Sequence, residues 1–209
     1  MRQFVTPGEE LPNDTKRNEY VMVSNGKAYS NILGFYDSDR KDIVPLEGLW
    51  KPRIGDSVIG VVERPTKPGI YNVKLTEFVQ GLIITSKFDS GPSFEENDVI
   101  EATVANVERK RLAILERPRK LAVGQTIYVK PVRIPRIIGK SETMVSQISR
   151  LTGARIIIGR NGIIWLNGGN VALAIEAIKK VEREAHTSGL TEKIKSMLEA
   201  EVGLTSSHE

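Results

Sequence analysis

Short runs of alternating apolar and polar residues, separated by turn-forming residues, dominate the chain between about positions 51 and 124. Alternation with a period of two is typical of half-buried β-strands, because successive side chains point to opposite faces. Five such runs without a helical pattern between them favour a small closed barrel of the OB type, with an SH3-like barrel as the alternative. The predicted strands cover residues 57–63, 70–75, 81–85, 99–107 and 112–115.

The first 50 residues contain shorter β-like runs and many turn signals. Tyr20–Val23 and Lys27–Ser30 flank the pair Asn25-Gly26. An Asn-Gly pair between two such runs predicts a hairpin with a type I′ turn, because both residues tolerate the positive φ that this turn requires. No helical period occurs here, so we predict a small N-terminal β domain over residues 1–50.

The apolar spacing becomes helical after residue 124. Ser141–Leu151 has apolar residues every three or four positions, Asn170 can cap a second helix, and Leu190–Val202 predicts a third. With a strand at Thr126–Val129 and a hairpin at Arg155–Leu166, the element order is β-α-α-β-β-α-α, which is that of a KH-type RNA-binding unit with a C-terminal addition. The predicted fold is therefore mainly β with an α+β C-terminal part, divided into domains over 1–50, 51–124 and 125–209.

The net charge of +4 is unevenly distributed over the 209 residues. Residues 107–160 hold thirteen Lys or Arg and three Glu, a net charge of +10, which leaves −6 for the rest of the chain. A basic middle between acidic ends indicates a polyanion-binding face, and its many arginines suit bidentate phosphate contacts. The alternative is a solvated basic surface that is paired with acidic neighbours.

The residue types needed for most catalytic and metal sites are scarce. Cysteine is absent, which excludes disulfides and thiolate zinc sites. The two histidines are His186 and His208, so a Ser-His-Asp triad or a histidine-based metal site is not expected. No P-loop or nucleophile–base pair is found, and we expect neither enzyme activity nor a metal or other cofactor. No apolar run approaches the roughly 20 residues that span a bilayer, and residues 1–5 lack a signal-peptide pattern. We expect a cytoplasmic protein without membrane contact.

Five motifs along the chain share one family pattern. They are Val5–Leu11 (VTPGEEL), Asn25–Ser30 (NGKAYS) followed by Gly34, PLEG at 45–48 with KPRIGDSVIG at 51–60, IIGK at 137–140 and GRNGIIW at 159–165. In this order they resemble the RNA-binding cap subunit of the archaeal and eukaryotic exosome, of the S1-plus-KH type called the Rrp-four family. The last motif, of the form GxNGxIW, is the most specific of the five.

The resemblance implies a non-catalytic subunit that binds single-stranded RNA. In that family three copies cap a hexameric ring of RNase-PH-like subunits, the N-terminal segment docks on the ring, and the cap helps to capture and thread RNA for 3′-to-5′ degradation and processing. A homotrimer is expected, or a mixed trimer with the family's other cap protein, whose cysteine-ligated zinc ribbon this chain lacks. A stand-alone RNA chaperone or ribosome-associated factor is the main alternative, and a nuclease is the third.

In the S1-type barrel, basic residues beside turns are the candidates for RNA contacts, because such domains bind single strands by basic loops and exposed aromatics. Tyr71, Phe78 and Phe88 are the candidate aromatic residues, and aromatics are only 6% of the chain. This scarcity shifts the expected binding from base stacking to charge. The predicted RNA-binding residues of the barrel are Arg64, Lys67, Arg109, Lys110 and Arg111.

In the KH half, the family's G-x-x-G phosphate clamp corresponds to Gly139-Lys140-Ser141-Glu142, in which an acid replaces the second glycine. One interpretation is a degraded clamp in which Lys140 still meets phosphate, with Arg136 and Gly139 as further RNA-binding candidates. The other is a helix start in which Ser141 caps and Glu142 favours the helix dipole. We interpret GRNG at 159–162 as a hairpin turn with Asn161 and Gly162 at positive φ, and Trp165 as a core residue.

Overall fold

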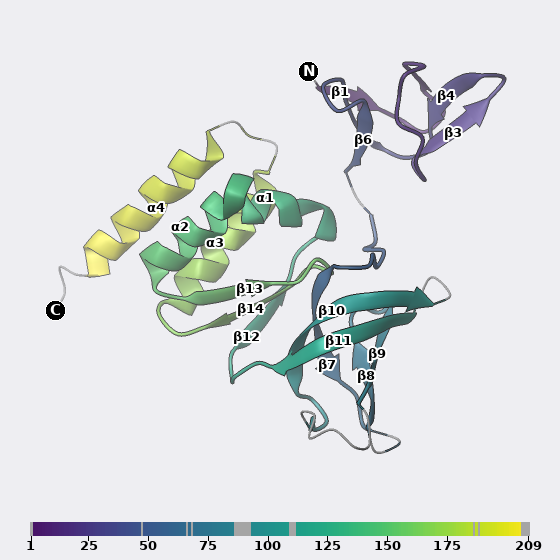
Figure 1. Ribbon diagram of the computed structural model, residues 1–209. Coiled ribbons are helices and arrows are strands. Elements are labelled where there is room, and N and C mark those ends of the chain that lie inside the picture. Colours follow the sequence, from purple (N-terminus) through teal and green to yellow (C-terminus); the bar gives the residue numbers. More distant parts are fainter. Residues whose placement is uncertain are drawn as a thin grey trace. The chain divides into compact units, whose positions relative to one another are not determined.

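The computed structural model describes residues 2–46, 48–65, 67, 69–85, 93–108, 112–185, 187 and 189–205. The chain forms two compact units, Met1–Leu49 and Trp50–Glu209 (Figure 1). The predicted barrel and KH half both belong to the second unit, and the division of the chain into three domains stays a prediction. None of the described helices has the length and apolar character that a membrane span requires.

The N-terminal unit consists of two small sheets around its own core. One sheet has the strand order β1 (Arg2–Val5), β5 (Gly34–Asp37), β6 (Asp42–Pro45), and the other β2 (Glu10–Leu11), β4 (Lys27–Ser30), β3 (Val21–Ser24). Asn25 and Gly26 have φ values of 51° and 77°, which confirms the predicted I′-type hairpin between β3 and β4. The core residues are Val5, Leu11, Ala28, Tyr36 and Ile43.

A closed five-stranded barrel follows, as the alternating pattern predicts. Its strands are β7 (Ser57–Val62), β8 (Ile70–Lys74), β9 (Gln80–Ile84), β10 (Val99–Glu108) and β11 (Leu112–Lys120). β7, β8 and β9 form an antiparallel meander, β11 pairs with β9 in parallel, and β10 pairs with both β11 and β7 and so closes the barrel. This arrangement confirms the OB-like prediction.

The C-terminal half has the predicted order of strands and helices. Its elements are β12 (Gln125–Tyr128), α1 (Ile134–Ile138), α2 (Thr143–Thr152), β13 (Arg155–Ile158), β14 (Ile163–Asn167), α3 (Val171–Arg183) and α4 (Leu190–Thr205), with 3-10 turns at Pro131–Arg133 and Lys140–Glu142. The antiparallel sheet has the order β12-β14-β13. Asn170 caps α3, because its side-chain oxygen accepts a 3.0 Å hydrogen bond from the backbone N–H of Leu173.

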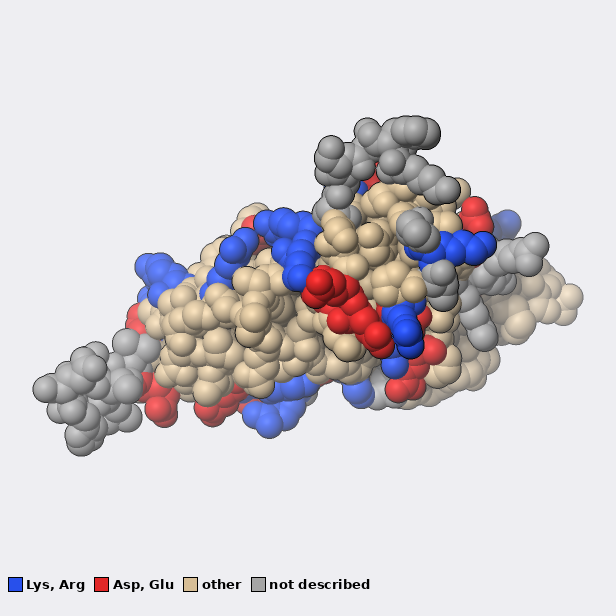
Figure 2. Space-filling view, turned by 90° about the horizontal axis from the view of Figure 1, so that it is seen from below, with Lys and Arg blue, Asp and Glu red and all other residues tan. Residues whose placement is uncertain are grey.

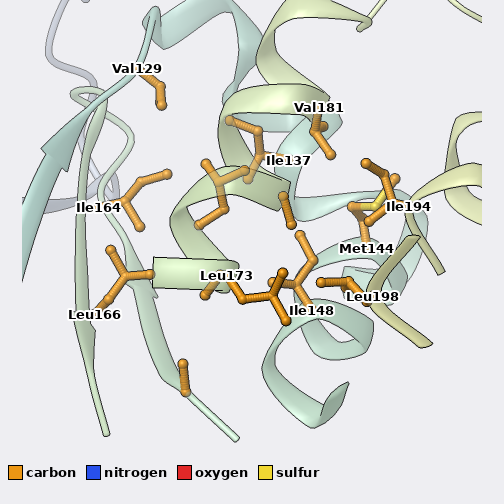
Figure 3. Packing of buried hydrophobic residues seen from close by; sticks show 14 of the residues in the cluster. Val129, Ile137, Met144, Ile148, Ile164, Leu166, Leu173, Val181, Ile194 and Leu198 are labelled. Atoms are coloured by element: carbon orange, nitrogen blue, oxygen red, sulfur yellow. The ribbon is translucent and has the colours of Figure 1, made fainter. Parts of the chain in front are cut away.

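Helices and sheet share one hydrophobic core (Figure 3). Ile164 and Leu166 of β14 point toward the helices, where Ile148 of α2 and Leu173 of α3 are buried. Ile194 and Leu198 of α4 are also completely buried in this core, together with Met144. The C-terminal helix therefore contributes core residues instead of lying loosely on the surface.

The turn between β13 and β14 joins the KH half to the barrel. Asn161 is completely buried; its side-chain Oδ1 accepts a 3.2 Å hydrogen bond from the N–H of Ile59, and its Nδ2 donates to the carbonyl oxygens of Ile59 at 2.7 Å and of Leu75 at 2.8 Å. Gly162 has a φ of 92°, but Asn161 does not have a positive φ. The expectation that both residues adopt the left-handed conformation was therefore wrong for Asn161, whose side chain instead binds the barrel backbone.

A second apolar cluster lies beside this turn. Trp165 is buried against Ile59 and Leu121 of the barrel, which confirms its prediction as a core residue. Its indole Nε1 donates to the carbonyl oxygen of Ala122 at 3.2 Å, and the guanidinium of Arg155 lies 5.9 Å from the ring centroid. The motif GxNGxIW thus supplies both a polar and an apolar connection between the two halves of the second unit.

Candidate nucleic-acid interface

The outward face of β8, β9 and β11 is aliphatic and polar. Residues that alternate with it along each strand are buried in the barrel. Ile84, at the end of β9, is among the most exposed apolar residues of the face, with 63% of its surface accessible. Two cross-strand rows are Lys74, Gln80 and Leu112, and then Asn72, Leu82 and Ile114.

The strand directions place the β7–β8 and β10–β11 connections at opposite ends of this face. Arg64 and Lys67 are both exposed in the β7–β8 connection, where Lys67 forms an isolated bridge with Ile70. The β10–β11 connection begins after Glu108 and ends before Leu112, which lies opposite Gln80 at the other end of the barrel. Arg109, Lys110 and Arg111 themselves lie outside the described residues.

The predicted aromatic candidates differ in their exposure. Tyr71 is buried and packs edge-on against Phe94, with ring centroids 5.3 Å apart, so its prediction as a base-stacking residue was wrong. Phe88 lies outside the described residues. Phe78, in the β8–β9 turn, is 53% exposed and is free to contact a ligand. The outward rows of the face itself contain no aromatic residue.

Part of the basic segment is paired with carboxylates. Arg117 pairs with Glu116, Arg119 with Glu101, and Lys120 with Asp98 at 2.7 Å. Burial of Asp98 opposes its ionisation, but hydrogen bonds from the Glu95 N–H and the Lys120 ammonium outweigh this and lower the pKa of Asp98. These three cations of β11 are therefore less available to phosphate than the net charge of the segment indicates. The alternative of a solvated surface paired with acidic neighbours therefore applies to this part of the basic segment, and polyanion binding by the rest of it stays a prediction.

Basic and acidic side chains are interspersed on the face of the molecule that Figure 2 shows. Lys and Arg occur there in several separate groups, with Asp and Glu between them. On this face, any polyanion would therefore meet local groups of cations. Among the residues that the structure describes, no group of three or more His, Cys, Asp or Glu side chains is arranged to hold a metal ion.

The altered clamp has a strained backbone. Gly139, Ser141 and Glu142 have φ values of 80°, 51° and 61°, so two residues with a Cβ adopt the left-handed conformation next to each other. Helix α2 begins after Glu142 without any side-chain capping hydrogen bond. The expectation that Ser141 caps this helix was therefore wrong. Lys140 is exposed, and its carbonyl oxygen accepts a 2.9 Å hydrogen bond from the Thr143 hydroxyl.

The structure places Arg136 and Gly139 in structural contacts. Arg136 is half-buried, and its Nη2 donates to the carbonyl oxygen of Thr187 at 2.9 Å, so the guanidinium binds the α3–α4 connection. A Cβ on Gly139 would lie 2.7 Å from the backbone nitrogen of Met144, so the tight packing at this position requires glycine. Of the three KH candidates, only Lys140 is exposed.

Replacing Glu142 with glycine is expected to raise the free energy of unfolding by about 1 kcal/mol, because glycine adopts the left-handed conformation without the Cβ clash. Urea unfolding measures this change. The matched control is Ser146→Gly at an exposed position inside α2, which should lower stability by about 0.5 kcal/mol. Loss of a negative charge should leave RNA affinity unchanged or raise it; a destabilised variant or a weaker complex would contradict this account of the clamp.

The similar proteins found by comparison share one name, exosome complex component Rrp4. No family model matches the chain. The exosome complex component Rrp4 of Pyrococcus horikoshii is 35% identical over an alignment that covers 94% of this chain and 82% of the relative. The Rrp4 component of Picrophilus torridus is 35% identical, over 95% of this chain and 93% of the relative. The Rrp4 component of Methanosarcina mazei is 32% identical, over 96% of this chain and 83% of the relative.

A solved structure agrees with these relatives. A crystal structure of a protein assigned as an exosome complex RNA-binding protein matches with a TM-score of 0.64 and 26% identity, over 76% of this chain and 99% of that chain. The relatives share at least 32% identity over nearly the whole chain. The chain therefore belongs to the Rrp4 family of exosome complex components.

Proposed function

We propose that the protein is a non-catalytic RNA-binding subunit of the exosome. The observation that carries this proposal is the match to exosome complex components Rrp4 over about 94% of the chain, which includes the N-terminal unit, the barrel and the KH half. The solved relative is assigned as an exosome complex RNA-binding protein, and its fold covers 76% of the chain. Assembly with other exosome subunits follows from the same relatives.

RNA binding is assigned chiefly to the barrel. Arg64 and Lys67 are exposed at one end of the face formed by β8, β9 and β11, and Arg109, Lys110 and Arg111 belong to the connection at the other end. A single strand that crosses this face would meet cations at both ends, which is the loop-plus-face arrangement of OB-type domains. Lys140 adds at most one cation in the KH half, whose clamp carries the negative charge of Glu142.

The proposal also includes the number of copies in the cap and the surface that docks on the ring. Three copies, or a mixed trimer with the zinc-ribbon cap protein, would cap a ring of RNase-PH-like subunits in the cytoplasm and thread RNA toward it. The N-terminal unit is assigned to docking, because its sheet β1-β5-β6 carries an outward apolar row of Phe4, Phe35 and Val44. Phe4 is 49% exposed and meets the Phe35 ring edge-on at 5.7 Å. Exposed aromatic pairs of this kind are typical anchors of protein interfaces.

Affinity for an unstructured RNA is expected to fall steeply with salt, because contacts to phosphate release counterions. The slope of log K against log salt for single strands is about −0.7 per neutralised phosphate. Alanine at both Arg64 and Lys67 should therefore make the slope shallower by about 1.4 if each contacts one phosphate. Fluorescence anisotropy at several salt concentrations measures both quantities.

The matched control for this measurement is Arg117→Ala, an exposed arginine that is already paired with Glu116. It should leave the slope unchanged. An affinity that does not respond to salt would refute the assignment of RNA binding to these cations. Degradation of the RNA by the pure wild-type chain would refute the non-catalytic part of the proposal.

A further inference from the structure

Two aromatic side chains stand apart from the others in the second unit. Among its described residues, Trp50, Tyr71, Phe94 and Trp165 are buried. Phe78 and Tyr128 are instead 53% and 56% exposed, although one belongs to the barrel and the other to the KH half. Leaving an aromatic ring in water forgoes the stabilisation that its burial would provide. Two such rings in one compact unit therefore call for a common explanation.

The Tyr128 ring and the β8–β9 turn that carries Phe78 both contact the turn that joins the barrel to the KH half. Tyr128 ends β12, and its ring lies against Gly162, where a Cβ would come within 3.1 Å of the tyrosine Cε2. Phe78 belongs to the β8–β9 turn, which starts at Leu75; the Leu75 carbonyl oxygen accepts the 2.8 Å hydrogen bond from Asn161. The buried Asn161 and its neighbour Gly162 thus connect the backbone segments that carry the two rings.

Hydrogen bonds hold the backbone segments that carry the two rings. The hydroxyl oxygen of Thr76 accepts hydrogen bonds from the N–H groups of Phe78 at 3.2 Å and Val79 at 3.0 Å, which fixes the β8–β9 turn. The Lys179 ammonium donates to the carbonyl oxygen of Tyr128 at 2.6 Å and so anchors the end of β12. A backbone that is ordered before binding loses less conformational entropy on contact with a ligand.

The surroundings suit bases better than phosphates. Burial, Glu182 and Glu77 raise the pKa of Tyr128, so its phenol stays neutral at physiological pH. Lys74 is exposed at the end of β8, where it can meet the backbone of a strand whose bases contact the rings.

We propose that Phe78 and Tyr128 form a base-stacking site for single-stranded RNA at the junction of the barrel and the KH half. The inference rests on the proposed RNA-binding function and adds a location for stacking, which the aliphatic face of β8, β9 and β11 does not provide. Base–aromatic stacking tolerates any base, because every base has a π-face. The site therefore adds affinity for unpaired nucleotides without selecting a sequence.

The test compares Phe78→Ala, Tyr128→Ala and the double variant in the full chain. Affinity for an oligo(A) strand should fall about 5-fold or more for each ring, the low end of measured stacking contributions. Binding of inorganic polyphosphate, a polyanion without bases, should stay within 2-fold of wild type. Phe78→Leu, which keeps an apolar side chain without a π-face, should lose as much RNA affinity as Phe78→Ala. Phe4→Ala, an exposed phenylalanine of the N-terminal unit, is the matched control and should leave RNA affinity unchanged.

A second measurement covers the case in which an alanine variant is misfolded. Phe78→Trp should show fluorescence that oligo(A) quenches and polyphosphate does not. RNA affinity within 2-fold of wild type in a folded double variant would overturn the inference while wild-type RNA binding still supports the proposed function. A double variant that binds RNA normally but no longer joins the exosome ring would overturn it in favour of a protein-docking site. Absence of RNA binding by the wild-type chain would instead refute the proposed function.

Discussion

Replacing Asn161 with alanine is expected to lower the free energy of unfolding of residues 50–209 by about 3 kcal/mol, because it leaves three buried backbone groups without partners. These groups are the N–H and C=O of Ile59 and the C=O of Leu75. Each orphaned group costs about 1 kcal/mol or more. Urea unfolding followed by the fluorescence of the buried Trp165 measures the loss.

Hydrogen exchange distinguishes a local effect from a general one. In the Asn161→Ala variant, the Ile59 amide should exchange faster than amides in the middle of α3, because the junction opens before the helices unfold. The matched control is Asn170→Ala, which removes one capping hydrogen bond from α3 and should cost only about 1 kcal/mol. Equal losses for the two variants would show that the Asn161 bonds do not hold the barrel and the KH half together.

Deleting residues 1–49 is expected to abolish co-elution with the RNase-PH-like ring subunits while RNA affinity is retained. The buried cluster of the N-terminal unit contains only its own residues, so the deletion takes no core residue from the barrel or the KH half. Because it does remove the exposed row of Phe4, Phe35 and Val44, the assigned docking surface is lost. Size-exclusion chromatography of the mixed proteins and RNA anisotropy of the shortened chain measure the two effects.

A point variant refines this prediction. Phe4→Ala should weaken ring association without unfolding the unit, because Phe4 lies outside its buried cluster. Met22→Ala, at a similarly exposed position on β3 of the other sheet, is the matched control and should have no effect. If the chain without residues 1–49 still joins the ring, docking belongs to the second unit. If the full chain never joins the ring but binds RNA, the stand-alone RNA-binding factor becomes the better description.

Most of the fold is predictable from the sequence because it depends on local periodicity. The barrel strands alternate, the helices repeat every three to four residues, and Asn25-Gly26 and Asn170 occupy the turn and cap positions that favour them. Tyr71 could also have been placed correctly. Its neighbours on β8 are Asn72 and the buried Val73, and a period of two puts Tyr71 on the same inward face as Val73.

The functional details depend on contacts between distant parts of the chain. Asn161 binds Ile59 and Leu75, which are 102 and 86 residues away, and an Asn-Gly turn looks the same in a sequence whether or not its side chain is used in this way. The GxNGxIW motif marks Asn161 as a residue of interest, but it does not indicate which backbone groups the Asn161 side chain binds. Arg136 is similar, because only the tertiary structure brings Thr187 to its guanidinium. Ion pairs such as Lys120–Asp98 also cannot be predicted from the net charge of a segment, because the two residues are distant in sequence.

The bond between Asn161 and the barrel has a consequence for how the chain is made. A ribosome finishes the last barrel strand at Lys120 and then needs a further 45 residues to reach Trp165. At about 5–20 residues per second, the nascent barrel waits roughly 2–9 s with Ile59 and Leu121 uncovered and without the partner for the Ile59 amide. Synthesis that stalls in this interval would release a chain with an apolar patch beside unpaired backbone groups, which chaperones and proteases recognise. The same residues that make the finished unit rigid therefore make its early fragments vulnerable.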